Sequence, residues 1–186
     1  MNPHYTYLAL DLGSILGPLL LSFDKKVAFY KRWPALFPAM LMTGVIFLVW
    51  DELFTRAGVW GFAPEYVTGV YIGSLPIEEV LFFLFVPYAC MFVYECLNVY
   101  IKPDFWGKYA RAIMVGLALL LIVVAALYLG HLYTSITFAG TAILLLVNAF
   151  FLRPSWWGRF FLAWMVCLIP FFIVNGVLTS LPVVWY

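Results

Sequence analysis

Long apolar segments, separated by short polar or charged stretches, make up most of this chain. Six of them come close to the roughly 20 residues that a helix needs to cross the hydrocarbon core of a bilayer. These candidate spans are Tyr5–Phe23, Ala35–Phe54, Pro76–Leu97, Ala110–Leu129, Thr134–Leu152 and Phe160–Leu178. The pattern predicts an all-α integral membrane protein with about six transmembrane helices.

Composition supports a membrane protein. Of the 186 residues, 66% are apolar and 10% are charged, and the mean hydropathy is +1.03. A soluble domain is about half apolar and a quarter charged. A water-facing surface cannot be covered by this small number of charges. The lipid bilayer is therefore the expected partner. The net charge of +1 offers no basic patch for phosphates, which makes nucleic acid an unexpected partner.

The basic residues are distributed unevenly between the two sides of the predicted membrane. Nine of the ten lie between the first and second, third and fourth, or fifth and sixth spans: Lys25, Lys26, Lys31, Arg32, Lys102, Lys108, Arg111, Arg153 and Arg159. Only Arg56 lies on the other side. The positive-inside rule then predicts a multi-pass protein of the cell (inner) membrane with its N-terminus outside. Tryptophans near the predicted helix ends, Trp60 among them, are expected to form the interfacial belt.

Acidic residues occur within the predicted spans, where they are costly. Five would lie in the outer half of the membrane: Asp11, Asp51, Glu52, Glu78 and Glu79. A carboxylate there is unfavourable unless it pairs, reaches water or takes a proton. Arg56 is the only nearby cation in the sequence, so at least one of these carboxyl groups is expected to be protonated at neutral pH. Two structural alternatives are helix-end capping by Asp51 and Glu52 and hydrogen bonding of Asp11 to a neighbouring helix.

The segment from Gly73 to Phe83 is typical of a helix start. Pro76 suits a first turn, with Ser74 or Gly73 as the cap, and two acids there also favour the helix dipole. Adjacent residues point about 100° apart on a helix, so at least one of Glu78 and Glu79 must face protein or lipid.

Aromatic residues follow these two acids at helical spacing. Glu78 shares a helix face with Phe82 and Phe85, and Glu79 lies above Phe83. A desolvated, protonated carboxyl group can give its proton to an alkene, and ring faces can stabilise the resulting carbocation by cation–π attraction.

The string Pro76-Ile77-Glu78-Glu79, followed by Phe82-Phe83, resembles the PxEE signature of the small membrane lycopene cyclases. The resemblance is dense over about Pro18–Glu95 and includes Trp50-Asp51-Glu52, Gly58-Val59-Trp60-Gly61-Phe62 and Pro87-Tyr88.

This resemblance implies an enzyme that cyclises the end groups of lycopene, or of a related linear carotenoid such as a C50 compound, to ionone rings as in γ- or β-carotene. Either Glu78 or Glu79 would donate the proton, and the other, or Asp51, would accept the released one. The candidate substrate-binding residues are Pro76, Phe82, Phe83, Tyr88, Trp50 and Asp11. We expect no cofactor and no metal, because no nucleotide-binding or metal-binding motif is present.

Family members consist of two related three-helix modules. The resemblance implies a first module at 1–98, a linking transmembrane helix at 99–132 and an incomplete second module at 133–186. A shift of 125 residues lays Leu53-Phe54-Thr55 on Leu178-Thr179-Ser180. The second signature would then begin near position 201. We expect either that the chain continues beyond Tyr186 in its full form or that a homo-oligomer or a partner module supplies the second site.

Two functions of other classes stay open from the sequence. A non-catalytic carotenoid-binding or scaffold subunit of a heteromeric membrane enzyme would bind pigment without turnover. A small proton or cation transporter would need polar residues through the bilayer, whereas Val80–Val86 is apolar throughout.

Overall fold

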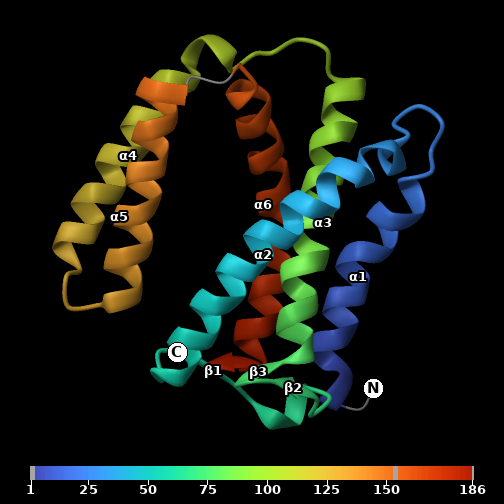
Figure 1. Ribbon diagram of the computed structural model, residues 1–186, viewed down its shortest axis with the longest axis vertical. Coiled ribbons are helices and arrows are strands. Elements are labelled where there is room, and N and C mark those ends of the chain that lie inside the picture. The colour runs from blue at the N-terminus through green and yellow to red at the C-terminus, as the bar shows by residue number, and fades with distance from the viewer. Residues whose placement is uncertain (1–2, 153–154, 186) are drawn as a thin grey trace. The chain divides into compact units, whose positions relative to one another are not determined.

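The computed structural model of the protein describes residues 3–152 and 155–185 (Figure 1). Its helices are α1 (Thr6–Leu21), α2 (Trp33–Arg56), α3 (Ile77–Tyr100), α4 (Ala110–Leu127), α5 (Leu132–Val147) and α6 (Trp157–Ser180). Short 3-10 turns lie at Pro3–Tyr5, Phe29–Arg32, Pro64–Tyr66 and Gly107–Tyr109, and a π-helical turn follows α5 at Asn148–Leu152. Arg153, one of the basic residues of the orientation argument, lies outside the described residues.

Five of the six expected spans are long and apolar enough to cross a membrane. They are Phe29–Arg56, Ile77–Tyr100, Gly107–Leu127, Leu132–Leu152 and Trp157–Ser180. The first helix is the exception: α1 has 16 residues, about 24 Å at 1.5 Å per residue, which is shorter than a typical hydrocarbon core. The helical, multi-pass membrane fold is confirmed, and the side on which the N-terminus lies stays a prediction.

The chain packs as two compact units. One unit contains α1, α2, α3 and α6 from Ala163 onward, and the other is Ile101–Leu162, with α4 and α5. In the first unit, α1 and α2 both pack against α3. In the second, α4 packs along α5. These units are defined by packing, so they leave the proposed internal repeat untested.

The first unit has two separate hydrophobic clusters. One gathers Tyr7 of α1, Val67 of the loop after α2, and Leu178 and Val183 from α6 and the segment after it, with Phe82 of α3 packed against them. The other cluster contains Phe29, Leu36, Met40, Tyr88 and Phe92. Because α3 contributes to both clusters, it connects the two ends of the unit.

Two small antiparallel sheets cover one end of the first unit. β1 (Gly61–Phe62) pairs with β4 (Val184–Trp185), and β2 (Tyr71–Ile72) pairs with β3 (Leu75–Pro76). Figure 1 shows β2 and β3 at the end of the unit where α1 begins. Pro76 therefore lies in β3, one residue before α3 begins, and not in the first helical turn as the sequence suggested. Glu78 and Glu79 do lie in that first turn, as expected.

Gly73 allows the β2–β3 turn. Its φ of +65° is a conformation that residues with a side chain rarely adopt, and a Cβ there would lie 2.7 Å from Oε1 of Glu52. We expect Gly73→Ala to lower the free energy of unfolding by about 1–2 kcal/mol, measured by thermal unfolding in detergent.

Gly13→Ala is the matched control for this prediction. Gly13 lies inside α1, and a Cβ added to it would have no atom within 4 Å, so alanine should leave stability unchanged or raise it by up to about 1 kcal/mol. Equal unfolding midpoints for the two variants would contradict the importance of the Gly73 turn.

Candidate active site

Four carboxyl side chains come together where α1, α2 and α3 meet beneath the small sheets. Asp11 lies five residues after the start of α1, and Asp51 lies five residues before the end of α2, each about 7.5 Å along its helix. Glu78 and Glu79 are the second and third residues of α3. Asp11, Asp51 and Glu78 are buried, with exposed fractions of 2%, 3% and 0%. The structure thus brings together all four acids that the sequence selected for the site.

The first carboxyl pair is Asp51 and Glu79, which lie close enough to interact electrostatically. Each receives a hydrogen bond from an aromatic side chain. The Tyr7 hydroxyl donates to Oε2 of Glu79, and Nε1 of Trp60 donates to Oδ1 of Asp51 at 2.7 Å. Oδ2 of Asp51 is buried and makes no hydrogen bond with the residues that the structure describes.

The second pair is Asp11 and Glu78, which lie close enough to interact electrostatically. Oε1 of Glu78 accepts the backbone N–H of Thr68 at 2.8 Å. Oε2 of Glu78 and Oδ2 of Asp11 are buried, and neither makes a hydrogen bond with the residues that the structure describes. Glu78 is therefore fixed to the loop before α3 through one oxygen, while its other oxygen is buried without a partner among the described residues.

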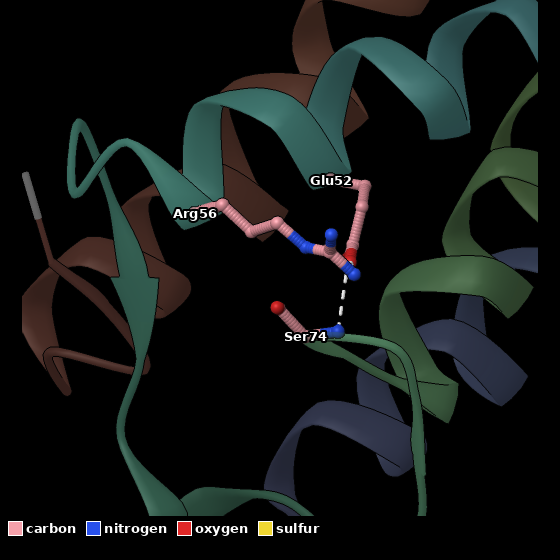
Figure 2. Close-up of polar contacts among 3 residues, drawn as sticks. All are labelled: Glu52, Arg56 and Ser74. Atoms are coloured by element: carbon pink, nitrogen blue, oxygen red, sulfur yellow. Dashed lines mark hydrogen bonds and ion pairs between the residues drawn. The ribbon is translucent and has the colours of Figure 1, made fainter.

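Glu52 and Arg56 form a separate contact outside this cluster. Glu52 pairs with Arg56 at 2.6 Å and accepts the backbone N–H of Ser74 at 2.9 Å, so it ties the end of α2 to the β2–β3 turn, as Figure 2 shows. Asp51, which is next in sequence but about 100° away around the helix, points into the cluster. The nearby cation is thus engaged by Glu52.

The cluster itself has no basic partner in the described part of the chain. The ion pairs found there are Arg56 with Glu52 and Arg32 with Glu95, and neither involves the four clustered acids. Within the same described ranges, no three His, Cys, Asp or Glu side chains are arranged to hold a metal ion. The acids therefore form two carboxyl pairs whose hydrogen bonds come from neutral donors.

Aromatic rings line the cluster on the α3 side. Phe82 lies beside Tyr7, with 6.5 Å between ring centroids, and meets Phe83 edge-on at 6.0 Å. Phe83 in turn stacks on Phe47 of α2 at 6.3 Å. Both predicted phenylalanines thus lie within one or two turns of the acids.

Trp50 contributes to the site indirectly. It stacks on Phe54 with 4.6 Å between centroids, and Phe54 stacks on Trp60 at 5.1 Å. This stack holds the indole that donates to Asp51. Trp50 therefore supports the position of the acid rather than touching it.

Tyr88 lies apart from the acids. It follows Glu79 by nine residues, about 13.5 Å along α3. Its hydroxyl accepts a hydrogen bond from Nε1 of Trp33 at 3.1 Å and shares another with Oγ of Ser22 at 2.5 Å. Pro76 is buried in β3 directly before the acid-bearing turn. Of the candidate binding residues, Tyr88 alone belongs to the second hydrophobic cluster.

Sequence reasoning did not select Tyr7 or Trp60, which both bind the carboxyl groups. Tyr7 precedes Asp11 by four residues and so shares its helix face, a spacing that could have identified it. Trp60 was expected in the interfacial belt, but it is 8% exposed and hydrogen-bonded to Asp51. The family-like string around Trp60, Gly58-Val59-Trp60-Gly61-Phe62, was the one sequence signal that could have singled it out.

A family model described as lycopene cyclase matches residues 4–97 and 130–186, which is more than half of the chain. The chain belongs to the lycopene cyclase family. The match contains all four clustered acids and leaves out residues 98–129, where α4 lies.

Curated relatives of this cyclase-family chain are described as bifunctional lycopene cyclase/phytoene synthases. It is 29% identical over 155 residues to the bifunctional lycopene cyclase/phytoene synthase of Aspergillus oryzae, an alignment that covers 76% of this chain and 25% of the relative. The protein of the same description from Aspergillus niger is 35% identical over 65 residues, covering 35% of this chain and 11% of the relative. The chain thus spans about a quarter or less of these relatives. No solved structure matches it.

Removing the Tyr7 hydroxyl tests the contact with Glu79. Because Tyr7 is 1% exposed, Tyr7→Phe would leave a buried carboxyl oxygen without its donor and should lower the free energy of unfolding by about 1–3 kcal/mol. Thermal unfolding in detergent measures this change. Tyr5→Phe, at a side chain that is 53% exposed, is the control and should behave like the unmodified protein. An equally small effect at both positions would argue against a stabilising Tyr7–Glu79 bond.

Proposed function

We propose that this protein cyclises the end groups of lycopene within the membrane, forming ionone rings without net oxidation or reduction. Family membership supports this activity. The observation that carries it is the close Asp51–Glu79 carboxyl pair, which has no ion-pair partner among the described residues and lies beside aromatic rings in an apolar unit. We place one shared proton on this pair. A protonated acid that is shielded from water has the properties needed to protonate a weakly basic alkene.

The proposed reaction is an isomerisation that balances without a co-reactant. Proton transfer to the terminal C1=C2 bond creates a cation at C1, and the C5=C6 bond attacks it to form the C1–C6 bond. The positive charge then lies at C5, and loss of a neighbouring proton to a base completes the ring. One proton enters and one leaves, so acid–base groups alone are sufficient.

We assign Glu79 as the acid and Asp51 as the base. Glu79 is only partly buried, whereas Glu78 is fully buried and bound to the Thr68 backbone. Glu79 also shares its contact with Asp51, so a proton accepted by Asp51 can return directly to Glu79 for the next turnover. Glu78 and Asp11 form the neighbouring acidic wall, whose negative potential favours the cationic intermediate.

The aromatic side chains have a matching role in this proposal. Phe82 and Phe83 follow the acids along α3, and Tyr7 lies against Phe82. A ring face next to a carbocation contributes about 0.5–2 kcal/mol, more when water is excluded. Phe82 and Phe83 would stabilise the cation while offering no oxygen that could trap it, and the Tyr7 hydroxyl is already engaged by Glu79.

The positive-inside asymmetry supports a location in the cell membrane with the N-terminus outside. This orientation would place the four acids near the outer face.

Substitution of the acids tests the proposed cyclase. In bacteria that accumulate lycopene, the unmodified chain should produce cyclised carotenoid, measured by HPLC of pigment extracts. Glu79→Gln and Asp51→Asn should each reduce conversion by about 100-fold or more, because proton transfer is lost while side-chain size is kept. Glu65→Gln, at an exposed position in the same loop region, is the control and should convert normally.

Two outcomes would contradict these proposals separately. Full conversion by Glu79→Gln together with loss in Glu78→Gln would overturn the acid assignment and move the role to Glu78. Unchanged lycopene with the unmodified protein present in the membrane would show that this chain alone is not a cyclase. Pigment retained without turnover would then favour the carotenoid-binding subunit.

A further inference from the structure

An apolar groove with a volume of about 580 Å³ lies between α2 and α3. Its α2 wall runs from Phe37 through Gly44 to Leu48, and its α3 wall includes Val80 and Phe83. Every lining residue is apolar. The volume is in the range of small-molecule sites, but the usual convergent polar groups are missing from its walls.

One end of this groove lies within one helical turn of Asp51 along α2 and of Glu79 along α3. Leu48 precedes Asp51 by three residues on α2, and Val80 directly follows Glu79 on α3. Phe83, one helical turn after Glu79, lies on the same helix face as that acid. From Leu48 to Phe37 the α2 wall extends over eleven residues, about 16 Å. The groove is thus a long apolar channel with an acid pair at one end.

We propose that the α2–α3 groove holds the polyene chain of the substrate, with the reacting end group at the Asp51–Glu79 pair. This inference rests on the proposed cyclase function and names the surface that binds the rest of the molecule. An unsubstituted linear hydrocarbon needs no hydrogen-bonding partner, and the groove offers none. Its burial there would be driven by shape and dispersion contacts alone.

The main competitor for the groove is a phospholipid acyl chain, which is also apolar. A saturated lipid tail offers the Asp51–Glu79 pair no alkene to protonate, whereas a polyene that reaches Leu48 presents one. The polyene therefore makes use of both the groove and the acids at its end.

Gly44 provides the space in the middle of the α2 wall. A Cβ added there would meet no atom within 4 Å. A glycine inside a helix is unfavourable by about 1 kcal/mol relative to alanine, so larger residues at this position should not weaken the helix. Substitution of Gly44 can therefore fill the groove without disturbing its walls.

The experiment compares Gly44→Ala and Gly44→Leu with the unmodified protein in the lycopene-accumulating host. We expect Gly44→Leu to reduce conversion at least ten-fold and Gly44→Ala to have a smaller effect, with unfolding midpoints at or above that of the parent. Gly17→Leu is the matched control, because Gly17 is an exposed α1 residue that also has no atom within 4 Å of an added Cβ. It should convert normally.

A second readout keeps the groove separate from the cyclase proposal. Glu79→Gln protein, purified from the same host, should retain lycopene in its absorption spectrum, and adding Gly44→Leu should lower the retained lycopene at least five-fold. Normal conversion and normal retention in the Gly44→Leu variants would overturn the groove assignment and leave the cyclase proposal intact. If the parent protein converts no lycopene but still retains it, and Gly44→Leu lowers that retention, the groove assignment would hold and the cyclase activity would be contradicted.

Discussion

The structure depends on holding three buried carboxyl groups and a fourth, partly buried one in an apolar helical unit, without an ion-pair partner among the described residues. Placing an ionised carboxylate in such a medium costs several kcal/mol unless its charge is neutralised or well hydrogen-bonded. The chain meets this constraint with neutral donors: the Tyr7 hydroxyl on Glu79, the Trp60 indole on Asp51 and the Thr68 backbone on Glu78. An arginine in these positions would have held the acids ionised and would have removed the proton on which the proposed chemistry depends.

The same constraint explains the small sheets and the loop between α2 and α3. That loop supplies Trp60 and Thr68, so it must be held close to the helix ends. β1 is fixed by β4 from the end of the chain, and the β2–β3 turn is fixed to α2 by Glu52. Two adjacent acids on α2 thus have different tasks, because a helix turns them about 100° apart: Asp51 serves the cluster and Glu52 holds the loop that supports it.

The arrangement of α2 and α3 connects the acids to an apolar surface suited to a long hydrocarbon. Both helices carry their acids at one end and apolar residues along the groove below. Reaction and binding are therefore separated along the length of the same two helices. In this proposal the polar groups set the chemistry, whereas the groove sets which molecules can present an end group to them.

The sequence by itself determined the class of fold and the acids of the site. A helix in lipid must satisfy its own backbone hydrogen bonds and be apolar over about 20 residues. Five of the six spans could therefore be predicted from continuous runs of apolar side chains. The exception is α1, which is shorter than a full membrane span. Charges inside such runs are costly, which made Asp11, Asp51, Glu78 and Glu79 conspicuous. The tertiary structure decided the partners. It decided which acids pair, and it placed Trp60 on Asp51, Tyr88 in another cluster and β1 beside β4. These contacts depend on how distant segments rotate and cross. Local periodicity carries no information about them.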